Sequence, residues 1–433
     1  MLKTRLSAMM FLQYAIWGAW LPLLYPFLLG HRGFTMDQVG TILAAGAAGA
    51  ILGPFLAGQV ADRWFATERY LGICHLIGAG LVWMLADTAD YTTFLWLSLV
   101  YGLVYAPTIA LTNSLALTHL EDRDRDFGPV RLWGTIGWIA VGIGVGQWLM
   151  YMHTPTGATE AVVAAAQDAG RADAFRLSAI LGGLMGLYSF SLPHTPPAKG
   201  EGEANATFEA LKEVRLQPLL TLFLLAVPVS IIHQFYFVHT SQFLSELQRA
   251  NADAAGFATG INRVLGVGGG GLMTIGQMAE IAVLAMIPLF AKSMSRKALL
   301  GLGLAAYAAR MAIFAYLGDS YPAVLAGLAL HGLCFGCFIF VAFMVVDEHT
   351  TPDVRASAQN LFNLVIVGIG IIVGSWFATS VVGKWATGAD GVVDYTRLFS
   401  VPMWISIACF ALLALFYPRH AVASQEQQES GLA

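Results

Sequence analysis

The chain has 433 residues, of which 57% are hydrophobic and 12% are charged. This charged share is about half of the ~25% found in soluble domains, which excludes an ordinary water-soluble fold because too little polar surface is available. A net charge of −4 without a long run of Lys or Arg also excludes nucleic acid as a partner, since phosphate binding requires concentrated positive charge. The composition therefore predicts a protein embedded in a lipid bilayer.

Twelve apolar segments are long enough to cross the membrane as α-helices, which takes about 20 residues each. They are too long and too little alternating to be strands of a membrane barrel. The first segment is also too long for a signal peptide and has no small-residue cleavage site, so we expect it to be retained. The fold class is thus an all-α integral membrane protein with 12 transmembrane helices, predicted at residues 6–29, 38–60, 70–88, 93–117, 129–152, 174–194, 218–243, 266–291, 298–317, 321–346, 357–383 and 396–417.

Basic residues predict the orientation of these spans. If both termini are inside, the inner loops and tails hold about twice as many Lys and Arg residues as the outer loops. Because Lys and Arg are retained on the cytoplasmic side, we expect both termini to be cytoplasmic in a multi-pass protein of the cell (inner) membrane.

A polar stretch at residues 195–217 divides the chain. We predict an N-terminal six-helix half at 1–194, a cytoplasmic linker at 195–217, a C-terminal six-helix half at 218–417 and a cytoplasmic tail at 418–433. Two six-helix halves around a midplane cavity, one rocking against the other, are typical of secondary transporters. We expect such a carrier to act as a monomer.

The acidic residue at the middle of a predicted span is Glu280. Thr274, Gln277 and Glu280 recur at every third residue and therefore share one helix face, which we expect to line a cavity. Burial disfavours the charged form of a carboxyl, which suits Glu280 to carrying a proton reversibly. Alternatively, Arg310 lies at a similar predicted depth, and the two could form a static buried ion pair.

A second polar face combines Arg131, Thr135 and Trp138 in the span 129–152. Pro129 suits the first turn of this helix, so an alternative is that Arg131 lies near the membrane boundary and extends its side chain to water. Other spans repeat the pattern of polar groups beside rings. These further residues are Gln13, Trp17, Trp20, Tyr105, Thr108, Asn113, His233, Gln234, His331, Phe335 and Phe338.

Together, amide, guanidinium and hydroxyl groups beside flat rings suit a neutral ligand with a ring to stack and hydroxyls to bind, such as a nucleoside or a sugar. No intramembrane pair of catalytic groups and no motif of a metalloprotease or serine hydrolase is found, so we expect neither an enzyme nor a metal or cofactor site. A sensory receptor without transport would usually add an output domain, which the short tail does not provide.

At these residues the sequence resembles the nucleoside and proton symporter family of the major facilitator superfamily, close to the bacterial nucleoside permeases. The resemblance covers nearly the whole chain. It rests on FLQYAIWGAWL (residues 11–21), GQVADRW (58–64), ICHLIGA (73–79), YAPT (105–108), VRLWGTIGW (130–138), LPHTPPAK (192–199), GQMAE (276–280) and VRASAQ (354–359).

The resemblance implies proton-driven uptake of a nucleoside by alternating access, with a sugar or another ring-bearing polar solute as the alternative. Apart from the resemblance, Asp62 and Arg63, just after the span 38–60, can pair with neighbouring helix ends and so gate the cytoplasmic side; the alternative is a plain basic loop that obeys the inside rule. The resemblance further implies proton coupling at Glu280. The substrate-binding residues that it implies are Arg131, Thr135, Trp138, Gln234, Gln277, Glu280, His331 and Phe335.

Three positions depart from the family's pattern. Phe237 stands where an asparagine is expected, His331 replaces a tyrosine, and Gly336 replaces an aspartate. Each departure removes or changes a polar contact, and the third concentrates any proton-carrying role on Glu280.

Overall fold

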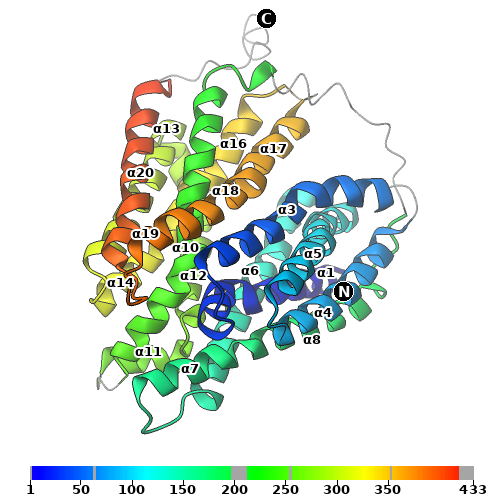
Figure 1. Cartoon of the computed structure of the whole chain (residues 1–433). Helices are drawn as coiled ribbons and strands as arrows, with labels where there is room; N and C mark the ends of the chain where they lie inside the picture. The colour runs from blue at the N-terminus through cyan, green and yellow to red at the C-terminus, as the bar shows by residue number, and fades with distance from the viewer. Residues whose placement is uncertain (1, 62–64, 197–211, 253–255, 352–353, 419–433) are drawn as a thin grey trace, which may run out of the picture. The chain divides into compact units, whose positions relative to one another are not determined.

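The computed structural model describes residues 2–61, 65–196, 212–252, 256–351 and 354–418. Helices dominate these residues, and the β-structure among them is one isolated bridge between Thr387 and Val393. Figure 1 shows the helices with their labels. Contacts divide the chain into two compact units. Unit 1 comprises residues 1–200, 236–277 and 375–384, and unit 2 comprises 201–235, 278–374 and 385–433.

Unit 1 contains most helices of the N-terminal part of the chain. The pairs α1 with α6, α3 with α5, and α4 with α8 pack against each other. Its elements are α1 (Leu2–Trp20), η1 (Leu21–Leu23), α2 (Leu24–Pro26), η2 (Phe27–His31), α3 (Met36–Ala61), α4 (Thr67–Asp87), α5 (Tyr91–His119), α6 (Arg123–Met152), α7 (Glu160–Gly170), α8 (Ala172–Ser189), α11 (Phe257–Leu265) and η5 (Phe377–Gly383).

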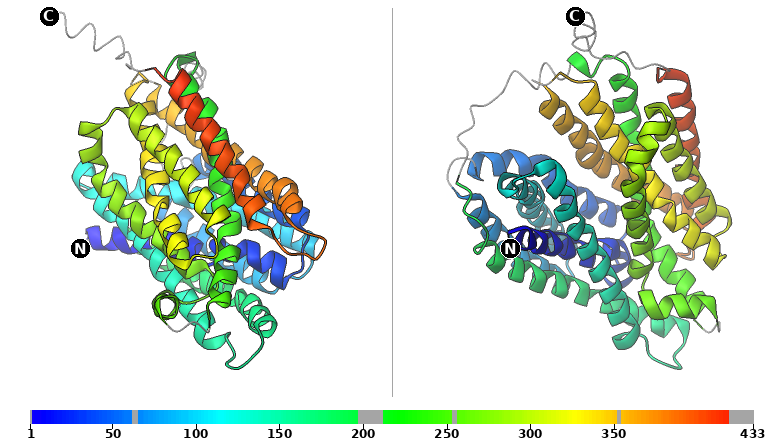
Figure 2. Two further views of the ribbon diagram at one scale, coloured as in Figure 1. Left: turned by 90° about the vertical axis from the view of Figure 1, so that its left-hand side faces the viewer. Right: turned by 180° about the vertical axis from the view of Figure 1, so that it is seen from behind.

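Unit 2 contains most of the later helices, among which α13 and α20 lie side by side (Figure 2). Its elements are α13 (Arg296–Tyr316), α14 (Tyr321–Ala329), α15 (His331–Leu333), η3 (Cys334–Phe340), α16 (Val341–Glu348), α17 (Arg355–Asn363), η4 (Leu364–Ile369) and α20 (Tyr395–Phe416). Four helices contribute residues to both units, namely α10 (Leu219–Ala250), α12 (Gly270–Ser293), α18 (Gly370–Trp376) and α19 (Lys384–Ala386).

The prediction of a multi-pass helical membrane protein is confirmed. Among the described residues, ten helices are long and apolar enough to cross a membrane. The two remaining predicted spans, 38–60 and 174–194, coincide with α3 and α8, which are not among those ten. A short helix that the sequence did not predict, α7, lies in the connection between α6 and α8.

The predicted start of the span 129–152 is wrong. The helix begins at Arg123, because the side chain of Asp122 caps it by accepting a hydrogen bond from the backbone N–H of Arg125 at 3.0 Å. Pro129 is therefore inside α6, and Arg131 lies about 12 Å from the start of the helix at 1.5 Å per residue.

Glycines allow α3 and α5 to approach closely. A Cβ atom on Gly102 of α5 would overlap the carbonyl oxygen of Gly46 in α3, and one on Gly49 would overlap the backbone of Gly102. Close approach through small residues is a principal source of helix association in membranes, where lipid removes the hydrophobic driving force.

We expect Gly102→Leu to destabilise unit 1 by about 1–3 kcal/mol, because the added side chain forces the two helices apart. The measurement is thermal unfolding of the purified protein in detergent. Gly80→Leu in α4 is the matched control, since Gly80 is exposed and nothing lies within 4 Å of its Cβ position. Equal unfolding temperatures for both variants would contradict this account of the packing.

Candidate functional site

The mid-helix carboxyl predicted from the sequence lies beside an imidazole. Glu280 is the eleventh residue of α12, and its Oε2 lies 3.7 Å from Nε2 of His331. The His331 side chain is 2% exposed and that of Glu280 is 16% exposed. The Glu280 side chain thus remains partly accessible, while its neighbour is enclosed in protein.

The second ring nitrogen of His331 contacts a buried cation. Nη1 of Arg310 lies 2.9 Å from Nδ1 of His331, and the guanidinium of Arg310 is completely buried. The same guanidinium lies 5.1 Å from the ring centroid of Tyr307, one helical turn earlier in α13. His331 therefore contacts both charged groups that the sequence placed at similar depth.

A second imidazole completes this cluster in unit 2. The ring of His233 stacks on that of His331 with 5.5 Å between centroids, and its Nδ1 lies 2.7 Å from the Tyr307 hydroxyl. We call Glu280, His331, Arg310, His233 and Tyr307 the carboxyl–imidazole cluster. Its members come from α10, α12, α13 and α15.

Two glycines explain why these helices come so close. A Cβ on Gly332 would overlap the backbone carbonyl of Ala279, the residue before Glu280, so glycine is needed beside His331. A Cβ on Gly336 would lie 2.7 Å from Cγ1 of Val283, so a larger residue at this position would require the Val283 side chain to move.

The other predicted residues of unit 2 occupy different surroundings. Phe335 is half-buried in η3, a π-helical segment that follows α15, the short helix that begins at His331. π-Helical turns inside longer helices occur frequently at functional sites. Gln234 in α10 is 8% exposed, and its side chain packs against Gly374 of α18, where a Cβ would lie 2.9 Å from its Cγ.

In unit 1 the three residues predicted on α6 lie beside α1. The guanidinium of Arg131 lies over the ring of Tyr14, 3.9 Å from its centroid, a distance typical of a cation–π contact. The rings of Trp138 and Trp17 meet edge to face with 6.1 Å between centroids. Thr135 lies on the same face of α6 and is half-buried. The face combines a cation, a hydroxyl and two indoles.

The side-chain amide of Gln277 provides a hydrogen-bond acceptor for a ligand. Its side chain is 7% exposed, and its Oε1 is buried without a hydrogen-bond partner among the described residues. Such an atom costs free energy unless a ligand or water satisfies it. Thr274, by contrast, donates to the carbonyl of Gly271 at 2.6 Å, so its hydroxyl is used within its own helix.

Several polar side chains that we predicted to contact a ligand form hydrogen bonds with other protein groups instead. Gln13 donates to the Thr108 hydroxyl at 2.8 Å and accepts from Nε2 of His75 at 2.8 Å, and Tyr105 donates to the carbonyl of Gln13. These residues are buried. They form a structural network between α1, α4 and α5.

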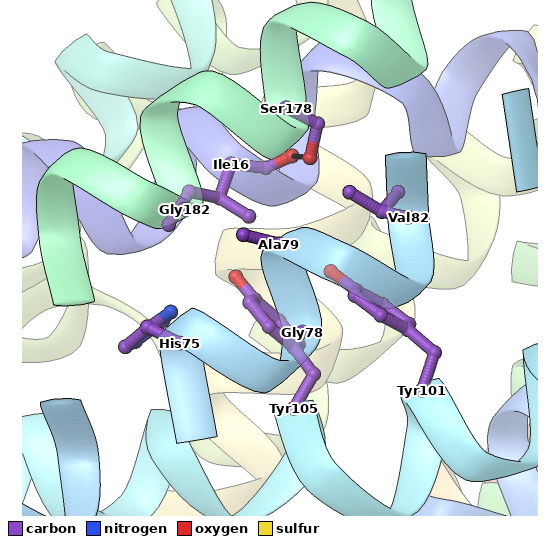
Figure 3. A pocket seen from close by; sticks show the side chains of 9 residues that line it. All are labelled: Ile16, His75, Gly78, Ala79, Val82, Tyr101, Tyr105, Ser178 and Gly182. Carbon is purple, nitrogen blue, oxygen red and sulfur yellow. Dashed lines mark hydrogen bonds between the residues drawn. The ribbon is translucent and has the colours of Figure 1, made fainter. Parts of the chain in front are cut away.

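Figure 3 shows a small pocket next to this network. It lies among α1, α4, α5 and α8, where Ser178 donates to the carbonyl of Ile16 at 2.7 Å and the rings of Tyr101 and Tyr105 stack. The pocket has no room for a water-sized sphere, so it is a packing gap and cannot hold a nucleoside.

The predicted gating residues Asp62 and Arg63 lie outside the described residues. Two residues that the sequence reasoning missed are Tyr14 and Tyr307. The spacing of both residues in the sequence could have predicted their contacts. Tyr307 precedes Arg310 by three residues, which places the two on one helix face. Tyr14 lies next to Gln13 and three residues before Trp17.

The sequence is similar to known transport proteins along nearly its whole length. The family model described as "Nucleoside H+ symporter" matches residues 1–421. The chain is 31% identical to the Escherichia coli (strain K12) protein YegT, over 96% of this chain and 94% of that protein. It is 28% identical to the xanthosine permease of the same organism, over 94% of this chain and 93% of the permease.

The fold is similar to that of a solved transporter. The crystal structure of the nucleoside transporter NupG superposes with a TM-score of 0.80 at 24% identity, covering 96% of this chain and all of that one. The family model spans nearly the whole sequence, and YegT is 31% identical over 96% of this chain. The chain therefore belongs to the nucleoside H+ symporter family, a family of proton-coupled nucleoside transporters.

Proposed function

We propose that the chain performs nucleoside uptake by alternating access, with Glu280 as the proton carrier. The observation that carries this proposal is the position of Glu280 at the middle of α12, in contact with the buried imidazole of His331. In this scheme Glu280 takes up a proton from outside, a nucleoside binds, and the loaded protein changes to an inward-open form that releases both.

The substrate contacts of this scheme come from the residues predicted in the sequence. Arg131 and Thr135 would bind hydroxyl or carbonyl oxygens, Trp138 and Phe335 would stack on the base, and Gln234 and Gln277 would bind its polar edge. His331 and Glu280 complete the predicted set. Among the residues that the structure describes, Oε1 of Gln277 has no hydrogen-bond partner, and the Arg131 guanidinium lies over the Tyr14 ring; both observations support these roles.

The architecture of the proposed carrier is the predicted one of twelve membrane helices in two six-helix halves. Both termini would be cytoplasmic in the inner membrane, and the protein would act as a monomer within the lipid bilayer. Asp62 and Arg63 would close the cytoplasmic side in one state and separate in the other.

We expect the purified protein in proteoliposomes to accumulate labelled uridine when a pH gradient, acidic outside, is imposed. A protonophore should abolish the accumulation while leaving exchange of labelled for unlabelled uridine, because only the former requires proton flux. Other nucleosides should compete with the label. If sugars compete and every nucleoside fails to do so, the substrate assignment is wrong and the alternative, a carrier of sugars, takes its place.

A further inference from the structure

We propose that His331 remains neutral throughout transport and holds Glu280 in position by hydrogen bonding, with Arg310 fixing which ring nitrogen carries the hydrogen. His331 is in this view a positioning residue for the proton carrier and does not itself carry the transported proton. The inference rests on the proposed role of Glu280.

The tautomer follows from the chemistry of the two partners. A guanidinium has N–H donors and no acceptor. Since Nη1 of Arg310 lies 2.9 Å from Nδ1 of His331, Nδ1 must accept this hydrogen bond through its lone pair. In a neutral imidazole the hydrogen then resides on Nε2. Nε2 is the atom that faces the Glu280 carboxyl.

The same contact disfavours protonation of His331. A second hydrogen on Nδ1 would point at the N–H of Arg310, so the hydrogen bond would be lost and two cations would face each other in a buried site. Arg310 and His331 are both buried, so bulk water screens this repulsion little. The imidazole is therefore better suited to donate to Glu280 than to take its proton.

The groups around His331 come from four helical elements. Glu280 of α12, Arg310 of α13 and His233 of α10 contact His331 itself, while Tyr307 of α13 and Cys334 of η3 lie near Arg310. Among these neighbours Glu280 is the carboxyl, so a change in its charge acts directly on the Nε2–H of His331. We expect the present separation of 3.7 Å, which exceeds a hydrogen bond, to shorten when Glu280 is ionised.

This arrangement has a consequence for transport. When Glu280 releases its proton, the N–H of His331 stabilises the carboxylate, and the Arg310 guanidinium polarises the imidazole in the same direction. Removing the donor would disfavour the ionised carboxyl, so the midpoint of the pH dependence of uptake would move to higher pH. Loss of one charge-assisted hydrogen bond corresponds to a shift of about one to two pH units.

The test compares two substitutions of His331 at saturating uridine in proteoliposomes. His331→Gln supplies an amide oxygen for Arg310 and an amide N–H for Glu280, yet cannot be protonated in this pH range. His331→Leu supplies neither. We expect the Gln variant to transport uridine with an altered KM and rate, because His331 belongs to the proposed substrate-binding set, but still to accumulate it against its gradient with the wild-type pH midpoint. The Leu variant should show a midpoint that is higher by one unit or more.

The outcomes are distinct. If His331→Gln loses accumulation but keeps exchange, the imidazole carries the proton and the proposal is overturned. An unchanged pH midpoint in His331→Leu would overturn it as well. If the Leu variant does not fold, the Gln variant decides, because only a neutral role of His331 predicts that its accumulation and pH midpoint survive.

His349→Gln is the matched control. This imidazole contacts the backbone carbonyl of Val345, four residues earlier, and lies outside the carboxyl–imidazole cluster. The accumulation of uridine and the pH midpoint of uptake should therefore be unchanged in this variant. Failure of the proposed function itself is recognised separately, because Glu280→Gln would then still concentrate uridine.

Discussion

Glu280→Gln should abolish concentrative uptake while retaining exchange of labelled uridine. Glutamine has the shape of the protonated glutamic acid and cannot release a proton, so the loaded protein can still change conformation without moving charge. One charge crossing 100 mV is worth ~2.3 kcal/mol. At ~1.4 kcal/mol per factor of ten, this supports roughly fifty-fold accumulation in the wild type. In the variant the ratio of internal to external uridine should fall to about one.

The comparison needs a control with the same chemical change. Glu160→Gln, at an exposed position in the first turn of α7, should concentrate uridine like the wild type. If Glu280→Gln still concentrates uridine in response to a pH gradient, Glu280 is not the proton carrier. If Glu280 and Arg310 instead form a static ion pair, exchange and thermal stability should fall together, because the substitution leaves a buried charge without compensation.

Arg131→Met should weaken nucleoside binding by about ten- to hundredfold. A hydrogen bond to a charged group contributes about 1.5–3 kcal/mol, and 1.4 kcal/mol is one factor of ten in affinity. Methionine retains much of the apolar stem that packs on Tyr14 but removes the donors. The measurement is the KM for uridine uptake together with competition by unlabelled nucleosides.

Arg131→Lys separates charge from shape. Lysine keeps the positive charge yet lacks the planar fork of donors that lies over the Tyr14 ring, so we expect it to recover only part of the affinity. Arg123→Lys, at the exposed first residue of the same helix, should leave the KM unchanged. An unchanged KM in Arg131→Met would mean that the guanidinium only packs against α1.

Local sequence patterns were sufficient to predict those features of the structure that depend only on composition or on helix periodicity. The length of apolar runs predicts the membrane helices, because a backbone in lipid must satisfy its own hydrogen bonds. The carboxyl at the middle of α12 was equally visible, as was the shared face of Arg131, Thr135 and Trp138, since residues at i, i+4 and i+7 lie together on any α-helix.

Other features depended on contacts between distant parts of the chain. No local sequence pattern distinguishes Gln13 from Gln277. Gln13 forms hydrogen bonds with His75 and Thr108, whereas the amide oxygen of Gln277 has no partner among the described residues. The start of α6 was missed because one side chain, Asp122, caps six residues that read as a polar loop. The π-helical turn that carries Phe335 likewise leaves no pattern in the sequence.

The sequence by itself determined that the protein is a bundle of membrane helices with a carboxyl at the centre of one of them. These properties follow from the cost of placing polar groups in hydrocarbon, which acts on each segment separately. The tertiary structure decided which side chains face that carboxyl. His331 reaches Glu280 because glycine at 332 lets α15 approach the backbone of α12, and α13 brings Arg310 to the other ring nitrogen; both approaches depend on how helices pack in space.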